Sequence, residues 1–150
     1  MLVKTVLNRV EHFKSFVFFA VSFQLVNGSK ALVVEIKVRT NSLPECPECG
    51  RRGRKYDMMQ ARLFEYVPIW AFQVFFRYAP RRVASPNHGA KVGAIPLAYG
   101  KERMAISYQV YLARWAMRLS WKEAAEVFKT SWLSDSPVCG RVLYCQSQPR

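Results

Sequence analysis

The dipeptide Asn27-Gly28 constrains the fold of this chain more than any other feature of its sequence. Asn-Gly is the preferred pair for the two-residue type I′ turn of a β-hairpin, because both central residues of that turn need a positive φ. A long apolar run, residues 16–26, leads into the dipeptide, and a second segment rich in apolar residues, 31–38, follows it. We therefore expect a hairpin in which Val26 pairs with Ser29.

This register matches the two strands residue by residue. On one face it places Phe23, Val21, Phe19 and Val17 opposite Leu32, Val34, Ile36 and Val38. On the other face it places Ser22, Ala20, Phe18 and Phe16 opposite Val33, Glu35, Lys37 and Arg39. Because directly opposed residues share a face, the pattern predicts one buried surface and one partly wet surface.

The apolar run also faintly resembles a signal peptide, since Lys4, Arg9 and Lys14 precede it. A cleaved peptide would not need its pattern matched by the residues that follow, so the hairpin is the better interpretation. The run is too short to span a bilayer, and no membrane partner is expected. The pair Cys46 and Cys49 is too closely spaced for a routine disulfide, which favours a reducing, cytoplasmic location.

The charge of the chain points to a polyanionic partner. Its 150 residues include 23 Lys and Arg against 10 Asp and Glu, a formal net charge of +13. Half of the residues are apolar (51%), so the chain can bury a core and is not disordered by composition. A soluble domain this basic most often binds nucleic acid, and the alternative is a ribosomal-type or merely basic protein.

A metal site is indicated by two short segments with the same frame. Cys46-Pro-Glu-Cys49-Gly50 has the spacing of a metal knuckle, and its glycine lets the backbone close around an ion. Ser85-Pro-Asn-His88-Gly89 repeats the frame. We therefore expect Cys46, Cys49 and His88 to be ligands of zinc. Ser85 is a degenerate fourth position, because a hydroxyl gives up its proton far less readily than a thiol.

Other interpretations of these residues stay open. The two cysteines could be unrelated thiols, and His88 could be a loop histidine with no metal. Three ligands and a water would imitate a catalytic zinc site. We reject that interpretation because no acid–base partner is visible in the sequence nearby, and zinc binding is expected to be weak or lost.

The rest of the chain changes from strands to helices. Residues 62–70 and 71–78 are rich in aromatic and β-branched residues and are predicted to pair as strands, whereas 40–60 and 80–100 are predicted to be loops. From Lys101 an apolar stripe has helical period (Tyr108, Tyr111, Leu112, Trp115, Leu119). Ser120-Trp-Lys-Glu123 is a capping box that opens a second helix ending near Lys129.

The two predicted helices suggest the first part of a helix-turn-helix motif. The pair Ala124-Ala125 would let a third helix cross closely. Residues 133–137 are a poor start for that third helix, and the tail from 133 to 150 is predicted to be aberrant or unstructured. Two core-packing helices with no role in DNA binding are the alternative.

Taken in order, these features resemble the N-terminal region of bacterial insertion-sequence transposases of the ISL-three group. The likeness rests on the hairpin, Cys46-Pro-Glu-Cys-Gly-Arg-Arg, Tyr78-Ala-Pro-Arg-Arg-Val, the second knuckle, and Leu119-Ser-Trp-Lys-Glu-Ala-Ala-Glu-Val-Phe with Thr130-Ser-Trp. It covers about Leu2 to Trp132. In that family a zinc-binding domain and a helix-turn-helix bind terminal inverted repeats of the element, and a downstream ribonuclease-H-like domain cuts and joins DNA.

The resemblance implies a truncated fragment that binds double-stranded DNA and is not an enzyme. Only two aspartates are present, Asp57 and Asp135, whereas a two-metal catalytic site needs clustered carboxylates. The expected phosphate contacts are Arg51, Arg52, Arg54, Lys55, Arg81, Arg82, Lys122 and Lys129. A homo-oligomer or a full-length transposase are further expected partners.

We therefore expect an α+β chain. Residues 1–100 would form a β-hairpin and zinc-ribbon-like domain, 101–132 helix-turn-helix-like helices, and 133–150 the tail. The rival interpretation is a basic zinc-ribbon protein that binds RNA or a protein partner, and a third is a decayed gene product with no function.

Overall fold

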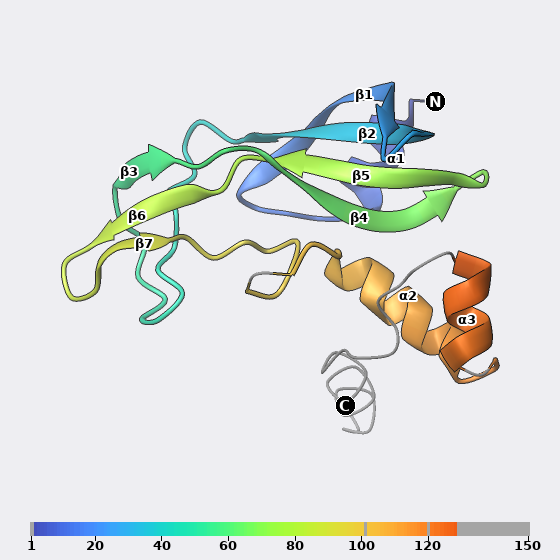
Figure 1. Ribbon diagram of the computed structural model, residues 1–150. Helices are drawn as coiled ribbons and strands as arrows, with labels where there is room; N and C mark the ends of the chain where they lie inside the picture. The colour runs from blue at the N-terminus through green and yellow to red at the C-terminus, as the bar shows by residue number, and fades with distance from the viewer. Residues whose placement is uncertain (1, 101, 120, 129–150) are drawn as a thin grey trace. The chain divides into compact units, whose positions relative to one another are not determined.

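The computed structural model describes residues 2–100, 102–119 and 121–128 (Figure 1). The chain divides into two compact units, the first ending at Met104 and the second beginning at Ala105. The first unit is rich in strands and the second is helical, so the described chain is a mixed α+β protein, as the sequence predicted.

The first unit contains one described helix and two sheets. The elements are α1 (Val3–Val10), β1 (Phe16–Val26), β2 (Ser29–Val38), β3 (Lys55–Met58), β4 (Arg62–Ile69), β5 (Phe72–Tyr78), β6 (Arg81–Ser85) and β7 (Gly89–Val92). Strands β1-β2-β5-β4 form a four-stranded sheet, and β3-β6-β7 form a three-stranded antiparallel sheet. Only Ala79 and Pro80 separate β5 from β6, so the chain passes directly from the large sheet into the small one (Figure 1).

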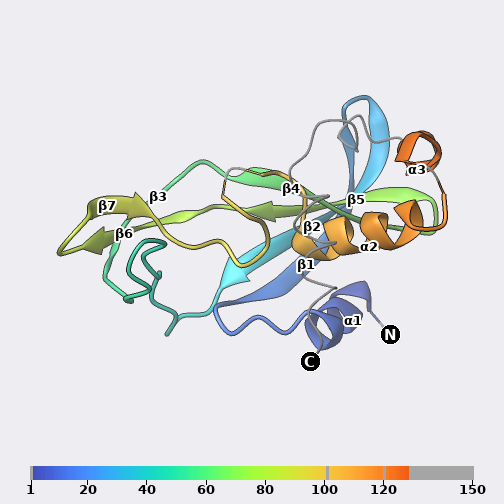
Figure 2. The same ribbon diagram turned by 90° about the horizontal axis from the view of Figure 1, so that it is seen from below.

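The four-stranded sheet holds most of the core of the first unit. It consists of two antiparallel hairpins, β1–β2 and β4–β5, which join through a parallel β2–β5 pairing (Figure 2). Its most deeply buried side chains are apolar: Phe16, Phe18, Val33, Val34, Phe64, Val74 and Phe76. Phe76 lies between two other rings, with centroid distances of 4.3 Å to Tyr66 and 4.9 Å to Phe18.

The predicted hairpin at Asn27-Gly28 is confirmed. Both turn residues have positive φ, 51° and 78°, and the predicted register holds from Val26 opposite Ser29 back to Ala20 opposite Glu35. This agreement shows how strongly the local preference of Asn-Gly sets the pairing of the two strands.

The predicted register is wrong beyond Ala20. A bulge at Phe19 places Phe18, not Phe19, opposite Ile36. One extra residue exchanges the two faces of the strand, so Phe16 and Phe18 are buried while Phe19 is 49% exposed. Phe19 instead lies on the solvent-exposed face, where Lys37 Nζ lies 3.4 Å from the centroid of its ring. The bulge thus buries two aromatic rings on the face where the simple register would have placed Val17.

The second predicted strand pair is also present, as β4 and β5. Its two-residue turn is Trp70-Ala71, and both residues have positive φ (49° and 63°) although neither is glycine or asparagine. The turn keeps the backbone twist that a tight hairpin needs at a cost in local strain. Trp70 lies in this turn and is 80% exposed.

The prediction of loops at 40–60 and 80–100 is wrong in part, because β3, β6 and β7 lie within them. These strands have four or five residues and little apolar alternation, so hydrophobic periodicity does not reveal them. Helix α1 was not predicted either. Asn8 connects it to the sheet: its side-chain NH₂ donates to the carbonyl oxygen of Phe18, and its side-chain oxygen accepts from the N–H of Phe18. Just after the helix, Glu11 accepts a 3.0 Å hydrogen bond from the Tyr66 hydroxyl.

The second unit consists, in its described part, of α2 (Ile106–Ala116) and α3 (Trp121–Phe128). The predicted stripe is buried at Tyr108 and Leu112, but Trp115 is 38% exposed, and Gln109 and Ala113 are buried beside the stripe. Phe128 of α3 packs edge-on against Tyr111, with ring centroids 5.5 Å apart. The predicted cap Ser120, the expected contact Lys129 and the tail 133–150 lie outside the described residues.

No helix in the described ranges combines the length and the apolar character that a bilayer crossing requires.

Candidate metal centre

The first turn of the site is closed by its own backbone. The Cys46 N–H donates to the carbonyl oxygen of Arg51, and the Gly50 N–H donates to that of Cys46, both at 2.9 Å. Gly50 has φ +66°, in the left-handed region that favours glycine. The turn therefore folds Cys49 back toward Cys46.

The second turn joins β6 to β7 and has the same frame. Ser85 pairs with Gly89 across the end of the hairpin, and Gly89 has φ +67°. The match in glycine conformation agrees with the similarity that the sequence showed between Cys46–Gly50 and Ser85–Gly89. Each turn thus presents its first and fourth side chains at the same end.

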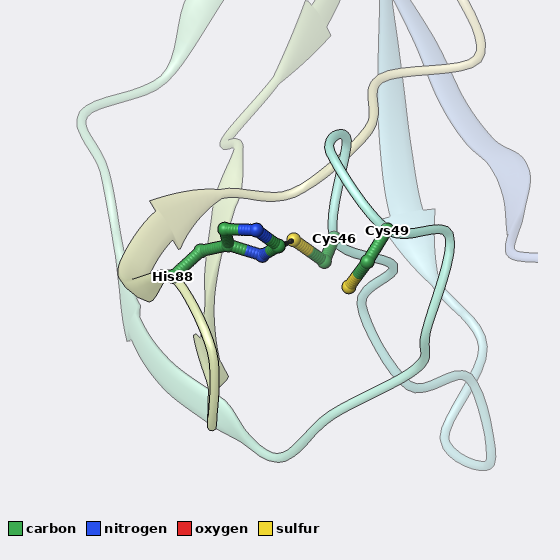
Figure 3. A group of neighbouring side chains, drawn as sticks. All are labelled: Cys46, Cys49 and His88. Atoms are coloured by element: carbon green, nitrogen blue, oxygen red, sulfur yellow. Dashed lines mark hydrogen bonds between the residues drawn. The ribbon is translucent and has the colours of Figure 1, made fainter.

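The fold brings these side chains together. Cys46 Sγ lies 3.8 Å from His88 Nδ1, and Cys49 Sγ lies 4.0 Å from Ser85 Oγ. The ligand atoms of Cys46, Cys49 and His88 all lie within 4.8 Å of one another (Figure 3). Three residues from two turns more than thirty positions apart could therefore hold a single metal ion.

Backbone hydrogen bonds hold the two turns against each other. Ala84 of β6 donates to Arg54, and Ala94 donates to Glu45, at 3.0 and 2.8 Å. Gly53 permits this approach, because a Cβ on it would lie 2.8 Å from the carbonyl oxygen of Ala84. The relative position of the two turns is thus set by main-chain contacts, and the group of ligands does not depend on side chains alone.

The separation between one sulfur and the imidazole nitrogen suits a tetrahedral ion. Bonds of about 2.3 Å to sulfur and 2.05 Å to nitrogen imply a sulfur–nitrogen separation of about 3.6 Å at the tetrahedral angle. The observed 3.8 Å between Cys46 Sγ and His88 Nδ1 is close to that value. Two thiols and an imidazole are soft and borderline donors, which suit zinc better than magnesium or calcium.

The surroundings of Cys46 lower the pKa of its thiol. Its side chain is buried, and the backbone N–H groups of Cys49 and Glu48 stabilise its thiolate. These hydrogen bonds outweigh the desolvation that opposes ionisation, and they lower the pKa of the Cys46 thiol to about 6, from an ordinary value of 9.0. The thiolate form, which is the form that binds metals, therefore predominates at neutral pH.

Glu48 contacts the imidazole of His88 on the side away from the thiols. Its Oε2 lies 3.4 Å from His88 Nε2, and its Oε1 lies 2.9 Å from Lys91 Nζ. The Lys91 hydrogen bond and charge lower the pKa of the Glu48 carboxyl. A carboxylate on one ring nitrogen orients a ligating histidine, so Nδ1 is left to face the thiols. The sequence analysis missed this role, although Glu48 stands between the two cysteines.

Ser85, the predicted degenerate fourth position, lies next to this group of residues. Its side chain is only 7% exposed, and its hydroxyl faces Cys49. A neutral hydroxyl is a poor zinc ligand compared with a thiolate, so Ser85 would contribute less to metal binding than the two cysteines and His88.

The predicted phosphate contacts fall into two groups. Arg51, Arg52 and Arg54 are exposed along the loop that follows the first turn, and Lys55 is exposed at the start of β3. Arg52 lies 4.0 Å from the Glu45 carboxylate. Arg81 and Arg82 are half-buried and already engaged within the fold. Arg81 donates to the carbonyl oxygen and the hydroxyl of Ser42, and Arg82 pairs with Asp57 at 3.1 Å. Lys122 is exposed on α3, and Lys129 lies outside the described residues.

Comparison with known proteins adds no relative: no family model, no curated protein and no solved structure matches this chain.

Proposed function

We propose that this chain is a nucleic-acid-binding protein that binds double-stranded DNA through the basic loop after its metal centre. The observation that carries the proposal is the position of Arg51, Arg52, Arg54 and Lys55. All four cations are exposed. They follow a turn whose backbone is closed, the Arg54 carbonyl oxygen accepts a hydrogen bond from Ala84 of β6, and Lys55 begins β3. Cations on an ordered loop can meet the regular phosphates of a duplex without a large entropic loss.

We assign zinc to the metal centre in this proposal. The thiol pair and the imidazole nitrogen suit zinc, and each pair of ligand positions lies on a tight glycine turn, as in a zinc ribbon. A zinc ion held by Cys46, Cys49 and His88 would link the two turns and stiffen the basic loop. The ion would thus act as a structural element and would not take part in a reaction.

The target of the proposal is the terminal inverted repeat of an insertion sequence. Its support is the resemblance of the sequence to transposases of the ISL-three group. In this interpretation α2 and α3 are the first two helices of a helix-turn-helix, and Lys122 contacts the phosphates that flank the major groove.

The proposal is tested by measuring binding of the full chain to a labelled DNA duplex between 50 and 200 mM salt. The logarithm of the binding constant falls with the logarithm of the salt concentration, and each lost phosphate contact makes this fall shallower by about 0.9. We expect steep weakening for the natural chain, and a slope about 1.8 smaller for the pair Arg51→Gln and Arg54→Gln. Absence of binding at low salt, or binding that does not respond to salt, would contradict the proposal.

An RNA duplex of the same sequence serves as the comparison. Tighter binding to RNA than to DNA would favour the rival interpretation of a basic protein that binds RNA. Equal loss in the variant pair Lys4→Gln and Arg9→Gln, which removes two exposed cations of α1, would show that charge alone and not the loop determines binding.

A further inference from the structure

Two adjoining hollows lie in the first unit, beside the loop that carries Cys46 and Cys49. The larger has a volume of about 580 Å³ and is walled by residues 12–15, the segment 41–45 and the stretch 93–96. The smaller, of about 350 Å³, lies between the end of β2 and the segment around β3. Arg39, Tyr78 and Arg81 line both hollows, so the two share one wall.

The charges on these walls are almost all positive. Lys14, Arg39, Arg52 and Arg81 line the larger hollow together with His12, against a single carboxylate, Glu45. Lys37 and Lys55 join Arg39 and Arg81 around the smaller hollow, whose lining contains no acidic residue. A concave surface of one sign concentrates its field and attracts an extended anion.

The shared wall is held in a defined geometry. Arg81 donates from its two terminal nitrogens to the carbonyl oxygen and hydroxyl of Ser42, and its Nε is buried with no hydrogen-bond partner among the described residues. The Arg39 side chain is exposed, while its backbone N–H is fixed by the carbonyl oxygen of Ser15 at 3.0 Å. One fixed and one accessible guanidinium thus stand between the hollows.

We propose that the two hollows form a track for successive phosphates of a nucleic-acid backbone, with Arg39 as the contact between them. This inference rests on the proposed function and places part of the DNA contact away from Arg51 and Arg54. Two neighbouring cationic hollows fit a polymer of phosphates better than a single small anion, which would occupy only one of them. Free phosphate and a nucleic-acid strand share the phosphate chemistry, and the test separates them.

The test compares two variants of the full chain that lose the same charge. Lys14→Gln with Arg39→Gln removes two exposed cations from the track, whereas Lys4→Gln with Arg9→Gln removes two exposed cations from α1. Binding of a labelled DNA duplex and a labelled oligothymidine is measured by fluorescence anisotropy against salt. For the track pair we expect an affinity loss of at least about tenfold at low salt. We expect a slope smaller by about 1.8 for the duplex or 1.4 for the single strand.

Four further measurements test explanations other than the track. Arg39→Lys keeps the positive charge and should retain most of the slope, and thermal melting should show that all variants remain folded. In the natural chain, nuclear magnetic resonance should show that DNA shifts the amide signals of Arg39, Ser42 and Gly93. Inorganic phosphate at matched ionic strength should not displace the oligonucleotide. Displacement by inorganic phosphate would overturn the track in favour of a single-anion site.

The failure of this inference differs from the failure of the proposed function. If the natural chain binds DNA and the two variant pairs weaken it equally, the phosphates do not follow this track and only the track is disproved. If the natural chain binds no nucleic acid at all, both the track and the proposed function are disproved.

Discussion

The two sheets of the first unit differ in how they are held together. The four-stranded sheet buries apolar side chains along all four of its strands, with several aromatic rings in mutual contact. Along β3, β6 and β7, only Val83 and Ser85 are buried. The large sheet can therefore be stabilised by hydrophobic burial, whereas the small sheet has little apolar burial and lies beside a group of residues, Cys46, Cys49 and His88, that could hold a metal ion.

The largest expected effect is the loss of a ring from the large sheet. Phe76→Ala removes a side chain that is 1% exposed and packed between two rings, so the free energy of unfolding should fall by about 3–5 kcal/mol. Chemical denaturation with and without a chelator measures the change, which should be the same in both. The control Val92→Ala, on an exposed position of β7, should change it by less than about 0.5 kcal/mol. A loss that depends on the chelator would mean that the two sheets are not stabilised separately.

The next effect is expected from removal of a candidate metal ligand in the turn that precedes the small sheet. Cys46→Ser deletes a thiolate, so zinc affinity should fall by more than about 100-fold, since loss of a supporting contact alone costs 10–100-fold. Hydrogen exchange should quicken across residues 45–58 and 81–94 and stay unchanged across 62–78. A chelator applied to the natural chain should produce the same pattern. Uniform quickening across both ranges would contradict the division between the sheets.

A smaller change should strengthen the small sheet. Ser85→Cys supplies a thiolate at the predicted fourth position, 4.0 Å from Cys49 Sγ in its present form. We expect slower release of zinc to a chelator and a higher melting temperature in the presence of zinc. The control Ser29→Cys, on an exposed position of β2, introduces a thiol outside the site and should change neither. If Ser85→Cys also changes neither, Ser85 is not a ligand position and the two turns do not form one site.

The smallest effect is expected at the turn of the large sheet. Ala71 has φ 63°, a conformation that costs an alanine about 1–2 kcal/mol and a glycine almost nothing. Ala71→Gly should therefore raise the unfolding free energy by up to about 1 kcal/mol, because the greater entropy of glycine in the unfolded chain offsets part of the gain. Thermal melting gives the value, and Ala90→Gly, in β7, should have the opposite sign. A destabilised Ala71→Gly protein would show that the turn is not strained.

Local sequence determined those features that depend on neighbouring residues. Asn27-Gly28 set one hairpin and its register as far as Ala20, and the two Pro-x-x-Gly frames predicted turns whose glycines have φ of 66° and 67°. The three candidate metal ligands also followed from these frames. In each case a backbone preference within four or five residues was enough to choose the conformation.

Tertiary structure alone decided the features that depend on distant partners. The bulge at Phe19 arises because burying Phe16 and Phe18 in the core outweighs a regular pairing of β1. Strand β3 exists because it finds a hydrogen-bonding neighbour, β6, more than twenty residues along the chain, whereas β6 and β7 form a local hairpin; the residues of all three strands carry little strand pattern. The contact of Glu48 with His88 and the two cationic hollows have the same origin. They join segments whose approach is set by the packing of the whole unit, so a short window of sequence holds no signal for them.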